Sequence, residues 1–159
     1  MFSRNPDGAG FMVARNGKVE IHKGFMEFGE FINAVNSMNF TDDDVIVYHF
    51  RISTQGGVNR EMCQPFGQTR HITETKALDV LANVGIAHNG IIPMTTDHRD
   101  KEYSDTAHFV AEYLPWMVRT PKDIKNPFIL DCIEEIINSK MVLMDGSILE
   151  SSLPSILWM

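Results

Sequence analysis

Four short polar clusters hold the side chains of this 159-residue chain that are best suited to chemistry. Each cluster stands where a β-prone or helical stretch is expected to begin or end, and a rigid scaffold usually presents functional groups at such ends. Their side chains include a guanidinium, carboxylates, imidazoles and amides, with glycines beside them. The clusters are residues 5–10, 49–56, 88–90 and 104–106.

Two oppositely charged residues of these clusters suit a zwitterionic ligand. Arg51 follows a run of hydrophobic residues. A guanidinium emerging from such a strand needs a partner, and a carboxylate bound in a bidentate manner has the best geometry. An internal ion pair with Asp or Glu is the more common arrangement. Asp105 suits a ligand ammonium, or it simply complements the N-terminus of a helix. Considered one by one, these residues favour the structural alternatives.

A third cluster offers hydrogen-bond donors without charge. Asn89 and Gly90 end a hydrophobic run, so the Asn side-chain amide and the Gly backbone N–H can point into the same space. Such a pair is what an oxyanion hole needs, where one donor is typically worth about 3 kcal/mol of transition-state stabilisation. The same dipeptide is also common in tight turns, which is the structural alternative.

The elements that must position these residues follow from hydrophobic spacing and turn signals. We expect two antiparallel strands around Asn16-Gly17, an amphipathic helix from Phe28 to Met38, and two strands buried on both faces. A helix is expected after Ser104 and another after Asn126-Pro127. The two buried strands are expected at 45–52 and 84–88. The remaining expected elements are a β-prone stretch at 71–75, a helical turn at 78–81, and a second hairpin formed by 140–144 and 148–149.

This order of elements predicts an α+β fold, because it is neither a βαβ alternation nor an all-β pattern. The length predicts a single domain over residues 1–159. Fourteen Lys and Arg against 21 Asp and Glu give a net charge of −7, which disfavours a nucleic-acid or anionic-membrane surface. No apolar run is long enough to cross a bilayer, and two cysteines without CxxC spacing favour a reducing cytoplasm. The histidine spacing predicts no metal site.

In their order along the chain, the clusters resemble the class II glutamine amidotransferases, which are N-terminal nucleophile hydrolases. The match covers most of the chain up to about Met117 and loosens after it. The resemblance implies an α+β four-layer αββα sandwich and a glutaminase that uses no cofactor. The matching pieces are NPDGAGFM (5–12), YHFRISTQGGVN (48–59), CQPF (63–66), VGIAHNG (84–90), SDT (104–106) and, as a later strand pair, KMVLMDGS (140–147).

The resemblance also implies a role for each matching residue. Arg51, helped by the Thr54 hydroxyl, would hold the α-carboxylate of glutamine or a related amino acid, and Asp105 would hold its α-ammonium. Asn89 and the Gly90 backbone N–H would form the oxyanion hole while the side-chain amide is cleaved. One cation, one anion and a neutral donor pair suit such a ligand on chemical grounds as well.

The nucleophile of that family is a cysteine at the very N-terminus, whereas this chain begins Met1-Phe2-Ser3. We therefore expect the sandwich to lack its first strand and the chain as given to be inactive. Cys63 paired with His49 or His88 is the substitute nucleophile to consider, but the family has a cysteine at that position without a nucleophilic role. Two alternatives remain open: a non-catalytic amino-acid-binding module, and a protein-interaction module or homo-oligomer that uses the apolar residues 156–158.

Overall fold

Two antiparallel sheets form the centre of the computed structural model, which describes residues 3–53, 57–95, 101–146 and 157–158. The fold is mixed α+β, as predicted. The first sheet has the order β3-β1-β2-β5, and the second has the order β4-β6-β7-β8. The strands are β1 (Ala9–Arg15), β2 (Lys18–Phe25), β3 (Ile46–Phe50), β4 (Phe66–Gly67), β5 (Asp79–Ala82), β6 (Val84–Asn89), β7 (Lys140–Asp145) and β8 (Leu157–Trp158).

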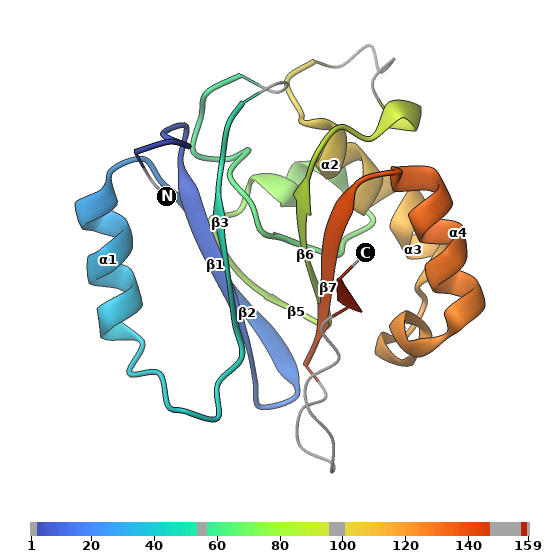
Figure 1. The fold of residues 1–159 in the computed structure, drawn as a ribbon, viewed down its shortest axis with the longest axis horizontal. Coiled ribbons are helices and arrows are strands. Elements are labelled where there is room, and N and C mark those ends of the chain that lie inside the picture. Colours follow the sequence, from blue (N-terminus) through green and yellow to red (C-terminus); the bar gives the residue numbers. More distant parts are fainter. Residues whose placement is uncertain (1–2, 54–56, 96–100, 147–156, 159) are drawn as a thin grey trace.

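Helices cover the outer faces of both sheets (Figure 1). The helix α1 (Phe28–Ser37) lies outside the first sheet. Beyond the second sheet, α2 (Asp105–His108) continues through a π-helical turn (Phe109–Tyr113) into α3 (Leu114–Met117), and α4 (Pro127–Ile137) follows. None of the helices in the described ranges has the length and apolar character needed to cross a membrane. Short 3-10 helices lie at Ile72–Lys76, Pro93–Thr95 and Pro121–Lys125.

The β1–β2 hairpin and two helix starts form where the sequence predicts them. Asn16 and Gly17 have φ angles of 51° and 75°, the pair of positive values that a two-residue type I′ turn requires. The Ser104 Oγ accepts a hydrogen bond from the Ala107 N–H at 3.2 Å and so caps α2. The Asn126 side chain caps α4 in the same way. These local signals act over two or three residues, so tertiary packing does not override them.

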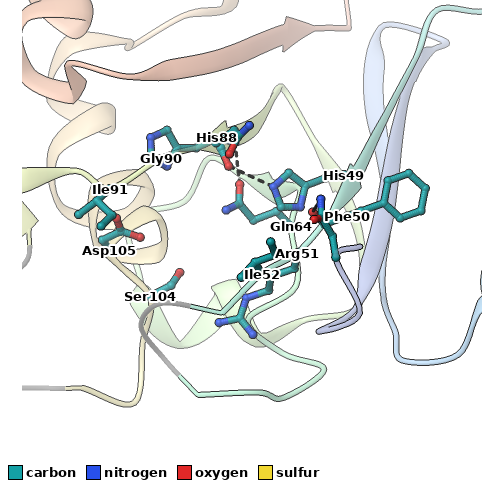
Figure 2. A pocket seen from close by; sticks show the side chains of 12 residues that line it. His49, Phe50, Arg51, Ile52, Gln64, His88, Gly90, Ile91, Ser104 and Asp105 are labelled. Atoms are coloured by element: carbon teal, nitrogen blue, oxygen red, sulfur yellow. Dashed lines mark hydrogen bonds between the residues drawn. The ribbon is translucent and has the colours of Figure 1, made fainter. Parts of the chain in front are cut away.

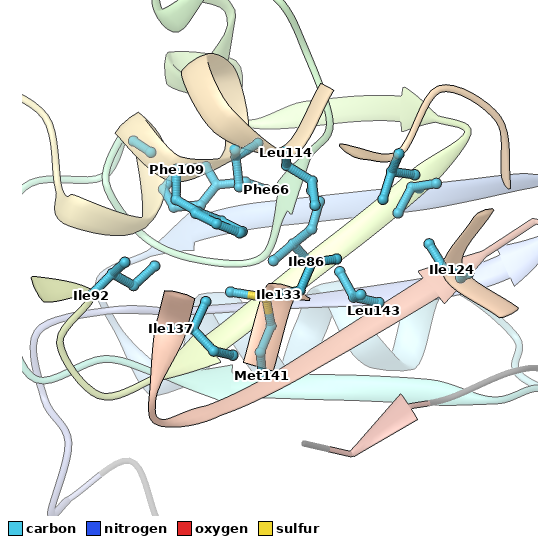
Figure 3. Close-up of a cluster of buried hydrophobic side chains, with 14 of the residues drawn as sticks. Phe66, Ile86, Ile92, Phe109, Leu114, Ile124, Ile133, Ile137, Met141 and Leu143 are labelled. Carbon is cyan, nitrogen blue, oxygen red and sulfur yellow. The ribbon is translucent and has the colours of Figure 1, made fainter. Parts of the chain in front are cut away.

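The apolar residues separate into three layers of packing. Phe11 and Phe31 belong to a cluster between α1 and the first sheet, and Met12 and Ile21 belong to a cluster of residues from the two sheets. The largest cluster joins the second sheet to the helices beyond it, as Figure 3 shows. Its fully buried side chains include Phe66, Ile86, Ile92, Phe109, Leu114, Ile124, Ile133, Ile137, Met141 and Leu143.

Two glycines of the second sheet allow the first sheet to pack closely against it. A Cβ atom on Gly85 would lie 2.7 Å from the Met12 sulfur and 2.8 Å from a Val19 methyl. A Cβ atom on Gly67 would lie 2.9 Å from atoms of Val80 and Ala82. Because real Cβ contacts are not this short, the spacing between the sheets depends on glycine at both positions.

Three sequence predictions need correction. Where a β stretch is predicted at 71–75, the structure has the 3-10 helix Ile72–Lys76, because hydroxyl groups bond locally there: the His71 N–H donates to Thr69 Oγ1 and the Thr75 hydroxyl donates to the Ile72 carbonyl. Residues 79–82 form β5, not a helical turn, because they pair with β2. The strand predicted at 45–52 lies at a sheet edge with Tyr48 43% exposed, so it is not buried on both faces.

The predicted C-terminal strand pair is tested only in part by the described residues. β7 forms as predicted, and its partner among the described residues is β8, where Val142 stands opposite Trp158 and Leu143 opposite Leu157. The predicted partner at 148–149 lies outside the described residues. Leu157 and Trp158, expected to provide a contact surface, take part in this strand pairing.

Candidate functional site

A pocket of about 290 Å³ brings together most of the residues that the sequence singles out. Arg51, Asn89, Gly90 and Asp105 all contribute to its lining, whereas Thr54 lies outside the described residues. Figure 2 shows the imidazoles of two histidines in the upper part of the view and the guanidinium of Arg51 in the lower part. The other lining residues are Asn5, His49, Phe50, Ile52, Gln64, His88, Ile91 and Ser104.

Asp105 is the first residue of α2 and is 5% exposed. Its Oδ2 accepts a hydrogen bond from the Ile92 N–H at 2.8 Å, and its Oδ1 accepts one from the Thr106 N–H at 2.7 Å. Because a carboxylate offers about four lone-pair sites, the group keeps acceptor capacity for a ligand donor. The two backbone bonds fix its orientation beside the pocket before any ligand arrives.

Asn89 is the last residue of β6 and Gly90 follows it directly, and both are exposed at the pocket. Gly90 has a φ of +149°, which L side chains rarely adopt. A Cβ atom there would lie 2.6 Å from the Ser139 Cβ. Glycine is therefore required at this position for both its backbone conformation and the close approach of Ser139.

The preceding residue, His88, is held at its backbone from two sides. Its N–H donates to Gln64 Oε1 at 2.7 Å, and its carbonyl accepts a hydrogen bond from His49 Nε2 at 3.1 Å, as the dashed lines in Figure 2 show. These contacts reach His88 from the Gln64 loop and from the end of β3. The strand end that presents Asn89 and Gly90 is therefore fixed by two other parts of the chain.

Arg51 is 4% exposed and is held by the N-terminal cluster. Its backbone N–H donates to the Gly8 carbonyl at 2.8 Å, and its backbone carbonyl accepts from the Asp7 N–H at 3.1 Å. The Asp7 carboxylate also accepts from the Ser53 N–H at 2.8 Å. The side chain donates from Nη1 to the Gly57 carbonyl at 2.7 Å. The first polar cluster thus positions Arg51, a role that its sequence alone does not indicate.

Gln64 can approach the pocket because two residues opposite it lack side chains. A Cβ atom on Gly10 would lie 2.3 Å from the Gln64 carbonyl oxygen, and one on Gly8, which has a φ of +118°, would lie 2.3 Å from the Cys63 sulfur. Residues 63–64 therefore pack directly on the beginning of β1. This packing carries the Gln64 side chain to the His88 N–H and, at 3.4 Å, to the Thr106 hydroxyl.

Burial changes the protonation of the groups around the pocket. It lowers the pKa of His49 to about 4, so this imidazole is neutral near pH 7. Because His49 Nε2 donates to a carbonyl, its Nδ1 carries no proton. Burial also lowers the pKa of His88, against the opposing effect of Asp105. The pKa of Arg51 is lowered by burial while the nearby acidic groups Cys63, Asp7 and Asp105 favour its charged form, and an arginine stays charged at neutral pH.

The thiol of Cys63 has surroundings unlike those of a nucleophile. Its Sγ contacts the carbonyl oxygens of Asn59 and Asp7 at 3.6 Å and 3.9 Å, and neither His49 nor His88 is a hydrogen-bond partner of this thiol in the described ranges. Burial raises the pKa of Cys63, although Arg51 and Lys23 act against that shift. Among all the residues that the structure describes, no group of His, Cys, Asp and Glu side chains could hold a metal ion.

Comparison of the sequence with protein-family models gives no match, and comparison with curated proteins gives none either. The resemblance to class II glutamine amidotransferases therefore stays a prediction from the sequence motifs.

Sequence reasoning missed several residues that build this site. Gln64 lines the pocket, but its residue type alone carries no signal for a ligand; Ser104, which also lines it, belongs to the predicted cluster 104–106 but was expected only to begin a helix. The sequence suggests His49 as a candidate base for the Cys63 thiol, whereas in the structure its ring donates a hydrogen bond to the His88 backbone carbonyl. One weak signal was available, since His49 stands two residues before Arg51 and alternate strand residues share a face.

Proposed function

We propose that the pocket binds glutamine, or a related amino acid, as the glutaminase site of a class II glutamine amidotransferase does. The observation that carries this proposal is the convergence of Arg51, Asn89, Gly90 and Asp105 on one pocket from three separate parts of the sequence. Chance placement of one cation, one anion and a donor pair around a hollow of about 290 Å³ is a poor explanation for that convergence.

In this proposal the charged groups hold the two ends of the amino-acid head. Arg51 binds the α-carboxylate, because its planar guanidinium matches a carboxylate in shape and charge. Asp105 binds the α-ammonium through the remaining acceptor capacity of its oxygens. Both residues are buried, so the ligand charges replace water that each group would otherwise bind.

The uncharged donors act on the side-chain amide. When a terminal cysteine is present, its thiol adds to the amide carbon and the carbonyl oxygen becomes an oxyanion, which Asn89 Nδ2 and the Gly90 N–H stabilise. The C–N bond then breaks, ammonia leaves with a proton, and water hydrolyses the thioester to glutamate. The described residues that line the pocket include no cysteine, so this chain as given is proposed to bind without turnover.

The order of layers supports the corresponding fold proposal. Helix α1, the first sheet, the second sheet and the helices α3 and α4 follow one another across the molecule (Figure 1). We propose that this order is the αββα sandwich of the N-terminal nucleophile hydrolases. In such a sandwich the site lies at one end of the two packed sheets, as the pocket does here between the ends of β3 and β6.

Calorimetric titration with glutamine tests the proposal. The chain should bind glutamine, and Arg51→Ala and Asp105→Asn should each weaken binding by about 1.5–3 kcal/mol, the usual contribution of a charge-assisted contact. The exposed residues Arg70 and Asp42 provide controls of matched charge, and Arg70→Ala and Asp42→Asn should bind as the wild type does. If the wild type and both pocket variants all fail to bind glutamine, the proposal is wrong.

A non-catalytic amino-acid-binding module is the second candidate, and the surroundings of Cys63 favour it. The buried thiol with a raised pKa is a poor nucleophile, so the chain would bind glutamine and release no glutamate. Both candidates expect this chain as given to release no glutamate, so an assay for glutamate and ammonia tests them together against turnover by Cys63. Rapid release that is abolished by Cys63→Ala would show instead that this thiol is the nucleophile.

A further inference from the structure

A chain of four contacts runs through the His88 ring to the proposed ammonium site. The Ser139 Oγ lies 2.8 Å from the Ile137 carbonyl oxygen and 2.7 Å from His88 Nε2. On the other side of the ring, His88 Nδ1 lies 3.0 Å from Thr106 Oγ1, which is 3.3 Å from Asp105 Oδ1. His88 is 2% exposed and Thr106 is 1% exposed, so water does not readily replace these bonds.

Counting protons along this chain shows that neutral His88 cannot complete it. Both ends, a carbonyl and a carboxylate, can only accept hydrogen bonds. Four contacts therefore need four protons, whereas the two hydroxyls and a neutral imidazole provide three. When His88 is neutral, one of the four contacts must therefore lack a proton. When His88 is protonated, the imidazolium supplies the fourth proton and every contact can be a hydrogen bond. With His88 protonated, the Thr106 hydroxyl has to donate to Asp105, since it accepts from the ring.

We propose that protonation of His88 closes this chain and thereby weakens the binding of an α-ammonium group at Asp105. The inference rests on the proposed amino-acid site and assigns His88 as a positioning residue that makes the site sensitive to pH. Two effects act in the same direction. The closed chain orients the Thr106 hydroxyl toward Asp105 Oδ1, and the imidazolium places a positive charge beside the carboxylate that must receive the ligand cation.

The other ionisable groups around His88 do not produce the same response. His49, which approaches from β3, has a pKa of about 4 and stays neutral above pH 5. Arg51, beyond it, stays charged throughout. On β7, Lys140 stands opposite Asn89 and is exposed. The segment from the Gln64 loop contributes a neutral amide. The carboxylate of Asp105 on α2 is thus the charged group most directly coupled to the ring.

The sign of the effect follows from the pKa of His88, which burial lowers below its ordinary value of 6.5. Affinity for glutamine should be constant at and above pH 7, where His88 is neutral, and should fall as the pH decreases below the ordinary histidine range. Glutamine itself keeps both charges between pH 5 and 8, so the ligand does not contribute.

The experiment measures glutamine binding by calorimetry at pH 7.5 and pH 5. The wild type should bind more weakly at pH 5, by up to about tenfold when His88 is fully protonated, the loss of roughly one charge-assisted contact. His88→Gln should bind equally at both values. His71→Gln, which changes an exposed histidine outside the pocket lining, should keep the wild-type pH dependence. Binding that is equal at both pH values in the wild type overturns this inference and leaves the proposed function standing.

A second measurement needs no ligand. Nitrogen-15 NMR of the His88 ring reports its protonation directly, and both Thr106→Val and Ser139→Ala remove an acceptor of the imidazolium. Each variant should lower the measured pKa of His88 relative to the wild type. Unchanged values in both variants overturn the contact chain, whatever glutamine does. Absence of glutamine binding at every pH overturns the proposed function and this inference with it.

Discussion

The two walls of the pocket are built in different ways. The Asp105 wall consists of residues 88–91 and 104–105 and stands on the end of a buried strand and the start of a helix. The Arg51 wall consists of residues 5 and 49–52 and stands on the end of an edge strand and the N-terminal segment beside it. In the first wall, Asp105 is bonded by the backbone N–H groups of Ile92 and Thr106, whereas in the second, residues 50–53 are bonded largely by the N-terminal segment, more than 40 positions away.

Because of this difference, the two charged groups of the pocket are held in position to different degrees before any ligand binds. Asp105 is held by two backbone donors and lies on regular structure, so its position follows from the core beneath it. Arg51 is held by Asp7, Gly8 and Gly57, which lie outside the helices and strands. Gln64 and His49 connect the two walls by bonding the His88 backbone. The predictions below test each wall and the connection between them.

Asp105→Ala should have the largest effect on stability. The change removes the buried carboxylate that accepts from the N–H groups of Ile92 and Thr106, so the free energy of unfolding should fall by roughly 2–5 kcal/mol. Urea denaturation measures it. Asp7→Ala makes the matching change in the Arg51 wall, where one acceptor for the Ser53 N–H is lost, and should cost about 1–2 kcal/mol. Equal costs would remove the difference between the walls.

Gly10→Ala should disturb the connection between the walls. The added Cβ would lie 2.3 Å from the Gln64 carbonyl oxygen and 2.7 Å from the Lys23 Cβ, so the Gln64 segment has to move. We expect a loss of roughly 1–3 kcal/mol in the free energy of unfolding and weaker glutamine binding. Gly29→Ala is the control, because a Cβ at Gly29 meets nothing within 4 Å and α1 should gain helix propensity. A neutral Gly10→Ala would show that residues 63–64 are not held by close packing.

Lys23 should make stability depend on pH through the same segment. Its buried ammonium donates to the carbonyls of Glu61 and Thr75 at 2.5 Å and 2.6 Å and lies 4.2 Å from the Phe66 ring centre. Burial lowers its pKa from 10.5 to about 7, although the nearby Cys63 and Glu61 favour the charged form. At pH values between 7 and 10.5, the unfolded chain binds more protons at Lys23 than the folded chain does. The free energy of unfolding contributed by Lys23 therefore increases with pH in this range.

Lys23→Met should remove this dependence. The difference in free energy of unfolding between wild type and variant should shift in favour of the wild type from pH 7 to pH 10, by at most ~1.4 kcal/mol per pH unit. Urea denaturation at several pH values measures it. Lys18→Met, at an exposed lysine of the same strand, serves as the control and should follow the wild type. A constant difference for Lys23→Met would contradict the expected titration.

Asp44→Asn should have the smallest effect, since it lies outside both walls. Asp44 bonds the Arg15 guanidinium, and that bond holds the pKa of its carboxyl below the usual range. The pair is partly exposed, so the loss should be about 1 kcal/mol or less near pH 7. Because the carboxyl pKa is lower in the folded chain than its unfolded value of about 4, the contribution should be complete above that pH and should decrease progressively as the pH falls below it. Glutamine affinity should not change.

The elements that the sequence predicts well are those specified by adjacent residues. Asn16-Gly17, Ser104 and Asn126 mark a turn and two helix starts through bonds within three residues. The stretch from 71 to 82 was assigned wrongly, because its 3-10 turn depends on local hydroxyl bonds and its strand depends on pairing with β2. β propensity contains neither kind of information.

The residues of the candidate site likewise fall into those that the sequence identifies and those that only the structure shows. The sequence identified Arg51, Asn89, Gly90 and Asp105 as a group, and the structure places these four at one pocket, while their roles stay predictions. The residues that hold them could not be found from the sequence. Gln64, Ser139 and Thr106 act through single contacts with His88, and such contacts leave no periodic pattern. Only the folded arrangement shows which acceptor each donor meets.

The narrow gap beside Gly67 and Gly85 controls the width of the pocket from a distance. Gly85 is three residues before His88 on the same strand, and the strand opposite it continues toward the segment that holds Arg51. A methyl group added at either glycine would act as a wedge between the sheets and tilt the two pocket walls apart. If the pocket binds glutamine as proposed, such a wedge should change the affinity for glutamine although every side chain that lines the pocket stays the same.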